Sequence, residues 1–161
     1  MLFCFHKIDR ASECKWTKIA LKSFHGKYVV AEKSGKANAN RNHARSWETF
    51  TVEDLGKNKI ALKSVHGKYL VAEKSNKDVN ANRSKRGPWE VFQVEKQRDG
   101  TIALKTSHGF YVVAEKDGRL RADRKKIGNW EKFTFECKKK SKLLNGINYY
   151  IMFIISSPSL Y

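Results

Sequence analysis

The tetrapeptide Ile19-Ala-Leu-Lys22 occurs again as Ile60-Ala-Leu-Lys63 and as Ile102-Ala-Leu-Lys105, at steps of 41 and 42 residues. A His-Gly pair follows each copy, and a Tyr-x-Val-Ala-Glu segment follows that pair. Each copy then ends in Trp-Glu-x-Phe, with the tryptophan at position 47, 89 or 130. A period of about 20 to 50 residues is typical of repeat architectures. We therefore expect three copies of one structural unit.

Each copy has the residue pattern of four short β-strands. In the first copy, Ile19 and Leu21 alternate with smaller or polar residues, and Gly26 favours a hairpin turn. The following segment 28–31 is aromatic and β-branched, and Phe50 and Val52 alternate in the last strand. Such runs, bounded by turn residues, predict strands. Because no window shows an apolar stripe of helical period, we expect an all-β domain.

Three four-stranded units of about 42 residues restrict the architecture. Propellers typically have about four to eight blades, and a closed barrel leaves few exposed sheet edges. We therefore predict a β-trefoil with three pseudo-threefold repeats of four strands each, at residues 18–58, 59–100 and 101–136. An N-terminal extension (1–17) precedes the trefoil, and a tail (137–161), first basic and then apolar, follows it.

The chain is strongly basic. Its 161 residues include 33 Lys and Arg against 16 Asp and Glu, a net charge of +17. Between Lys18 and Glu136, 26 basic and 14 acidic residues leave +12, so most of the charge belongs to the repeats. A basic surface indicates an acidic partner, but nucleic acid, anionic membrane, acidic glycans and acidic proteins all meet that description. Composition does not choose among them.

The repeated motifs resemble those of a known family. Ile-Ala-Leu-Lys-Ser-x-His-Gly-Lys-Tyr, Ala-Glu-Lys and Trp-Glu-x-Phe-x-Val-Glu are similar to the fascin-like, actin-crosslinking β-trefoils, a group that includes fascin and hisactophilin. The resemblance covers residues 18–136. It implies a twelve-stranded, monomeric domain of the cytoplasmic actin cytoskeleton that binds F-actin, and that bundles filaments when it presents two sites. With only five histidines, pH switching near neutrality is not expected.

The loops before the last strand of each unit are the predicted binding surface. Basic residues gather there, and the resemblance indicates a lysine-rich loop at the same place. Loops on a rigid scaffold often bind partners, and charge pairing with acidic residues of actin would fix register and raise the on-rate. The predicted actin-binding residues are Arg41, Arg45, Arg83, Ser84, Lys85, Arg86, Arg124, Lys125 and Lys126.

The other recurring residues have structural interpretations beside functional ones. Trp47, Trp89 and Trp130 could stack on a ligand, but a large aromatic repeated once per unit more simply fills a barrel. The histidines 25, 66 and 108 could meet at one zinc ion, but each precedes a turn glycine and is more simply a hairpin residue. The glutamates 48, 90 and 131 follow the repeat and are assigned to the fold. We expect no metal and no other cofactor.

Two further function classes remain open. Trefoils of the FRG type share the Ile-Ala-Leu-Lys-Ser-x-x-Gly-Lys-Tyr string and are linked to the nucleus and to RNA. A glycan-binding module has less support, because Arg45-Ser46 precedes Trp47 where ricin-type lectins have Gln-x-Trp. An enzyme is not expected, since no nucleophile elbow, phosphate loop or zinc-protease motif is present.

The cysteines and the chain ends suggest a location. Cys4, Cys14 and Cys137 are odd in number and lack metal-type spacing, which favours a reducing cytoplasmic or nuclear compartment. The first residues are too short an apolar stretch for a signal peptide. The apolar run 149–155 is much shorter than the roughly 17 to 25 residues that span a bilayer, so stable membrane insertion is not expected.

Overall fold

The computed structural model describes residues 18–138, which form twelve strands and one short helix. The elements in chain order are β1 (Lys18–Ser23), β2 (Tyr28–Ala31), β3 (Ala37–Arg41), β4 (Thr49–Asp54), β5 (Lys59–Lys63), β6 (Tyr69–Ala72), β7 (Val79–Arg83), the 3₁₀ helix η1 (Pro88–Glu90), β8 (Phe92–Lys96), β9 (Ile102–Thr106), β10 (Tyr111–Ala114), β11 (Leu120–Arg124) and β12 (Phe133–Lys138). The prediction of an all-β domain is confirmed.

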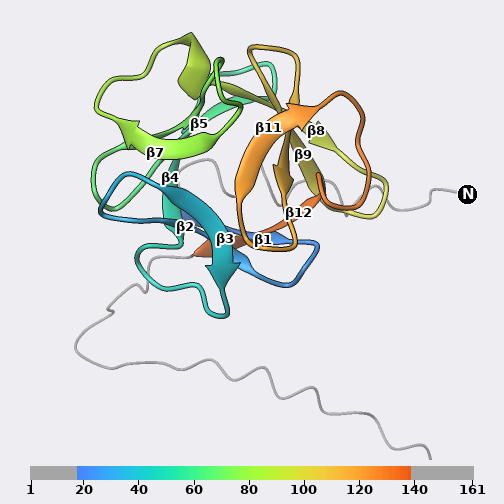
Figure 1. The fold of residues 1–161 in the computed structure, drawn as a ribbon, viewed down its shortest axis with the longest axis horizontal. Coiled ribbons are helices and arrows are strands. Elements are labelled where there is room, and N and C mark those ends of the chain that lie inside the picture. The colour runs from blue at the N-terminus through green and yellow to red at the C-terminus, as the bar shows by residue number, and fades with distance from the viewer. Residues whose placement is uncertain (1–17, 139–161) are drawn as a thin grey trace, which may run out of the picture.

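Six of the strands form a closed antiparallel barrel. Going round the ring, β1 pairs with β4, β4 with β5, β5 with β8, β8 with β9, β9 with β12, and β12 with β1 again. The other six strands form three hairpins outside the ring, β2–β3, β6–β7 and β10–β11 (Figure 1). Closure satisfies the backbone edges that an open sheet would expose.

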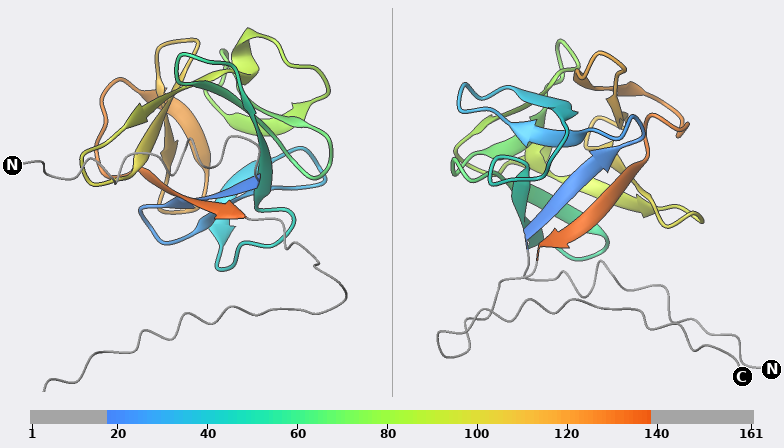
Figure 2. Two further views of the ribbon diagram at one scale, coloured as in Figure 1. Left: turned by 180° about the vertical axis from the view of Figure 1, so that it is seen from behind. Right: turned by 90° about the horizontal axis from the view of Figure 1, so that it is seen from below.

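The predicted β-trefoil of three pseudo-threefold repeats, each of four strands, is wrong. The structure is a closed six-stranded barrel with six outer strands. The longest barrel pairing joins different repeats, since β1 and β12 are in register from Lys18 opposite Lys138 to Ser23 opposite Phe133 (Figure 2). Within the last repeat, β9 and β12 pair only at Ile102 and Phe133. A sequence repeat shows which residues recur, but hydrogen bonding between strands decides the structural unit.

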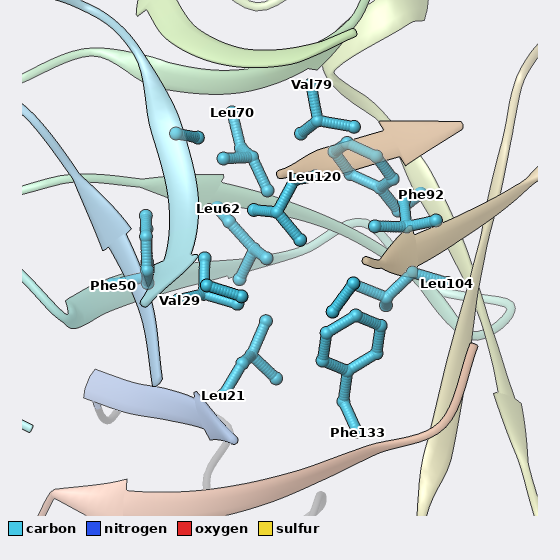
Figure 3. Packing of buried hydrophobic residues seen from close by; sticks show 14 of the residues in the cluster. Leu21, Val29, Phe50, Leu62, Leu70, Val79, Phe92, Leu104, Leu120 and Phe133 are labelled. Atoms are coloured by element: carbon cyan, nitrogen blue, oxygen red, sulfur yellow. The ribbon is translucent and has the colours of Figure 1, made fainter. Parts of the chain in front are cut away.

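The barrel encloses a core of apolar side chains. Phe50, Phe92 and Phe133 are at most 1% exposed, and Leu21 and Leu62 are equally buried. Figure 3 shows these rings and leucines pointing into the same space. Burying one such side chain contributes roughly 1.5–3 kcal/mol. The alanines of the Ile-Ala-Leu-Lys segments are fully buried as well, so those segments have little room for larger residues.

Backbone hydrogen bonds tie the three outer hairpins to one another. The Ala39 N–H donates to the Gly118 carbonyl at 2.7 Å, the Ala81 N–H to Gly35 at 2.8 Å, and the Ala122 N–H to Lys77 at 2.7 Å. The three acceptors lie in the hairpin turns at φ between 64° and 90°. A positive φ suits glycine, because the backbone of a residue with a side chain is strained at such an angle. Each hairpin turn therefore supports a neighbouring hairpin.

Some sequence predictions concern residues outside the described range. The N-terminal extension 1–17 and the apolar run 149–155 lie there, as do Cys4 and Cys14. Cys137, in β12, is disulfide-bonded, which is not what the reducing compartment expected from the cysteine count would favour. Within residues 18–138, no helix is long and apolar enough to cross a membrane.

The hairpin contacts give a stability prediction. A Cβ at Gly35 would lie 2.9 Å from Cβ of Asn82, whereas a Cβ at Gly26 would meet nothing within 4 Å. Both glycines have positive φ, so alanine costs roughly 1–2 kcal/mol at either place. At Gly35 alone, the contact of the new Cβ with Asn82 adds an overpacking cost of roughly 1–3 kcal/mol to the loss of stability. In urea unfolding, Gly35→Ala should therefore lose clearly more stability than Gly26→Ala, and equal losses would contradict the hairpin contact.

Candidate functional site

Three loops lead from the outer hairpins back to the barrel, and we call them the basic loops. The first comprises residues 42–48 between β3 and β4, the second 84–91 between β7 and β8, and the third 125–132 between β11 and β12. In Figure 1 they leave the barrel on different sides. They contain six of the nine predicted binding residues, and the other three end the strands before them.

The arginines that precede the loops are held in ion pairs. Arg41 lies 2.6 Å from Glu32, Arg83 lies 2.8 Å from Glu73, and Arg124 lies 2.8 Å from Glu115. A second glutamate lies 3.7–3.8 Å from the Nε of each arginine. These guanidinium groups link the hairpin to the loop. They are only partly available to a binding partner, although the sequence placed them among the candidate residues.

The second glutamate anchors the loop backbone. Glu48, Glu90 and Glu131 are each 5% exposed. Their Oε2 atoms accept hydrogen bonds from the backbone N–H of Arg45 at 2.8 Å, of Gly87 at 2.6 Å and of Gly128 at 2.7 Å. A buried carboxylate without partners would be costly, and here the arginine and the loop amide compensate it. The structure gives these glutamates the structural role that their recurrence suggested.

The tryptophans of the loops lie at the surface. Trp47, Trp89 and Trp130 are 38–39% exposed, so the prediction that they fill the barrel is wrong. Phe50, Phe92 and Phe133, three residues further on, fill it instead. From sequence, the larger aromatic looked like the core residue. In the structure, it is the phenylalanine within a barrel strand that points inward.

Each indole packs edge-on against a histidine from another repeat. The ring centroids lie 5.0 Å apart for Trp47 with His66, 5.0 Å for Trp89 with His108, and 4.9 Å for Trp130 with His25. The Nε2 atom of His66 also lies 3.1 Å from the Ala31 carbonyl oxygen. The histidines thus occupy three separate junctions instead of meeting at one point. Among residues 18–138, no group of three His, Cys, Asp or Glu side chains could hold a metal ion.

The remaining candidate residues differ in their availability. Arg86 pairs with Glu53 at 2.8 Å, and the Ser84 hydroxyl accepts a hydrogen bond from Lys68 at 2.6 Å. The other four are exposed and have no side-chain hydrogen bond or ion pair within the described range. These four free cations are Arg45, Lys85, Lys125 and Lys126. They offer one guanidinium on the first loop, one ammonium on the second and two on the third.

Arg86 belongs to a small network beside the second loop. Glu53 accepts hydrogen bonds from the Tyr69 hydroxyl at 2.6 Å and from Arg86 at 2.8 Å. The hydrogen bond to Glu53 and burial raise the pKa of Tyr69 above its ordinary value of 10.0, while the Arg86 charge lowers it somewhat. Tyr28 has the same arrangement with Glu136 at 2.7 Å, and its pKa is also raised.

This network can be tested by titration. In Glu53→Gln, the pKa of Tyr69 should fall towards 10.0 because the carboxylate that favours the neutral phenol is removed, while the pKa of Tyr28 should stay raised. A raised tyrosine pKa adds stability that is complete below pH 10 and is lost as the pH rises through the folded-state pKa. NMR titration of the tyrosine ring carbons measures both groups. An unchanged Tyr69 would show that Glu53 is not its partner.

Comparison with known proteins identifies a family without naming an activity. The family model described as "Domain of unknown function (DUF7910)" matches residues 15–138. No curated protein matches the chain. The matched residues include every strand of the barrel, every outer hairpin and all three basic loops. Because the match covers most of the chain, the protein belongs to the DUF7910 family.

Proposed function

We propose that this domain binds F-actin through the basic loops and crosslinks filaments when two loops are engaged. The observation that supports the proposal is the arrangement of the free cations. Arg45, Lys85, Lys125 and Lys126 are exposed, lie on three loops, and have no acidic partner among the described residues. The motif resemblance to actin-crosslinking proteins selects actin among the acidic polymers that such loops could meet.

The loops suit electrostatic recognition because their backbones are fixed. A buried glutamate holds each loop through a backbone N–H, and an arginine pairs with that glutamate. A loop that is already ordered loses less conformational entropy on binding. Exposed charges attract an acidic surface over about one Debye length, roughly 8 Å at physiological ionic strength. Binding should therefore weaken as salt is added.

Crosslinking requires two engaged sites on one molecule. The basic loops leave the barrel on different sides (Figure 1), so the proposal does not require the domain to dimerise in order to crosslink. Engagement of a second site depends on geometry and effective concentration as much as on affinity. A monomer with loops of unequal charge would bind one filament first and a second one more weakly.

A second candidate partner is single-stranded RNA, and the tryptophans favour it. Trp47, Trp89 and Trp130 are each more than one-third exposed and lie on the same loops as the free cations. Proteins that bind single strands combine a positive surface with aromatic side chains on which bases stack, at roughly 1–3 kcal/mol per base. This combination was not evident from the sequence, in which the tryptophans were assigned to the core.

The disulfide at Cys137 bears on the cellular location. Disulfides persist in oxidising compartments and are rare in the cytosol, where F-actin forms. The disulfide therefore counts against a cytosolic domain, and the actin proposal requires that Cys137 be reduced in cells. The redox state of Cys137 in cells is therefore a direct check on the compartment that the proposal requires.

Co-sedimentation tests the proposal. The triple variant Lys85→Glu, Lys125→Glu, Lys126→Glu should lose most of its pelleting with F-actin. A matched control changes three exposed lysines of the hairpin turns, Lys33→Glu, Lys74→Glu and Lys116→Glu. Its net charge equals that of the first triple variant. The control should pellet like the unmodified protein. Low-speed pelleting of the filaments reports bundling.

Three outcomes decide against the proposal. In the first, the unmodified protein does not pellet with F-actin at physiological salt. In the second, both triple variants lose binding equally, which would indicate that net charge alone controls binding. In the third outcome, RNA binds with a log-linear salt dependence while actin does not, which selects the second candidate.

A further inference from the structure

The first basic loop encloses an open hollow of about 620 Å³. Small-molecule sites typically occupy about 300–1,000 Å³. The side chains that supply its chemistry are Asn40, Asn42, His43, Arg45, Ser46 and Trp47. Two of them are basic residues, one presents an indole, and three offer an amide or a hydroxyl. The hollow is therefore polar, with one aromatic wall.

The walls of this hollow are fixed on both sides of Arg45. Its N–H donates to Glu48 at 2.8 Å, and its carbonyl accepts from the Thr49 hydroxyl at 2.6 Å. The Trp47 carbonyl accepts from the Ala31 N–H at 3.0 Å, and the Trp47 ring rests against His66. Because the backbone is held at these points, the side chains need little reorganisation to receive a ligand.

The charge of the hollow favours an anion. Arg45 is exposed and unpaired among the described residues, and a guanidinium can bind phosphate or carboxylate oxygens through two parallel hydrogen bonds. Arg41 and Glu48 also line the hollow. Arg41 is shared between Glu32 at 2.6 Å and the Oε1 atom of Glu48 at 3.8 Å, and the Oε2 atom of Glu48 accepts the Arg45 N–H, so both side chains are already engaged within the protein. An anionic group would therefore meet Arg45 as its main partner.

The combination of the Arg45 guanidinium with the Asn40 amide occurs in the first loop alone. Two residues before the tryptophan, the other loops have Gly87 and Gly128 in place of Arg45. Asn40 corresponds in the third repeat to Asp123, a carboxylate that pairs with two arginines. Both other loops thus lack the guanidinium at this position, and the third also lacks the amide. The difference also supplies a safe substitution, since glycine is accommodated at this position in both other loops.

We propose that the hollow of the first basic loop binds a sugar that bears one anionic group. The phosphate, sulfate or carboxylate binds Arg45, the apolar face of the sugar ring packs on the exposed part of Trp47, and ring hydroxyls hydrogen-bond the Asn40 and Asn42 side chains. Asn42 keeps its amide N–H groups for this purpose, because its Oδ1 atom accepts from Lys27. This small-ligand site goes beyond the proposed binding of filaments.

A titration followed by NMR tests the site, with glucose 6-phosphate and glucuronate as the probes. Either probe should shift the Trp47 indole N–H and the amides of residues 42–48, and should leave the second and third loops nearly unchanged. Comparison of the two probes shows whether phosphate or carboxylate is preferred. Glucose alone and inorganic phosphate alone should each bind at least about tenfold more weakly, because each lacks one of the two contacts.

Two variants make the test specific. Arg45→Gly should weaken binding at least about tenfold without unfolding the loop, and Lys116→Ala, in a hairpin turn, should leave it unchanged. The proposal is overturned if neither probe shifts the first loop, if all three loops shift alike, if inorganic phosphate binds as well as glucose 6-phosphate, or if Arg45→Gly binds normally. These assays contain no filaments, so their outcome is independent of the actin result.

Discussion

The antiparallel pairing of β1 with β12 closes the barrel, and the positions of the outer hairpins and loops depend on it. Lys18 lies opposite Lys138 and Ser23 opposite Phe133, so the first and last described strands are neighbours along their whole length. The pairing brings together the two ends of the described chain. Without it, the sheet would have two open edges and the core phenylalanines would lose one wall.

Outside the barrel, two kinds of contact hold the basic loops. Buried glutamates bridge an arginine and a loop N–H, and histidines from another repeat support the tryptophans. Their repetition explains why Glu48, Trp47 and His66 have counterparts in every repeat. Several exposed cations of the loops, such as Arg45 and Lys125, do not recur. The scaffold therefore repeats, while the surface that could bind a partner differs from loop to loop.

Part of this architecture could be predicted from the sequence. Alternation around Ile19 and Phe50, with the glycine turns between, was enough to predict strands, because side-chain direction follows the two-residue period of a strand. Which strands pair could not be predicted, since hydrogen bonds between distant segments leave no local pattern. The exposure of Trp47 was missed for a related reason, because the space in the barrel was already filled by Phe50 and its counterparts.

The candidate site was predictable as a region and not as a set of contacts. Charge clustering indicated these segments, and the structure shows them as loops between an outer hairpin and the barrel, but the ion pairs of Arg41 with Glu32 and Glu48 involve residues separated along the chain. The hollow beside Trp47 had one sequence signal, which is Arg45 where the other loops have glycine. That signal has meaning only when the loop backbone is known.

The central claim is that buried glutamates hold the basic loops rigid, so that their cations and indoles are presented in fixed positions. Native-state hydrogen exchange of individual backbone amides tests it most directly. The N–H groups of Arg45, Gly87 and Gly128 donate to these glutamates, and we predict that they exchange nearly as slowly as amides of the barrel strands. Exchange at the rate of an unstructured loop would contradict the account.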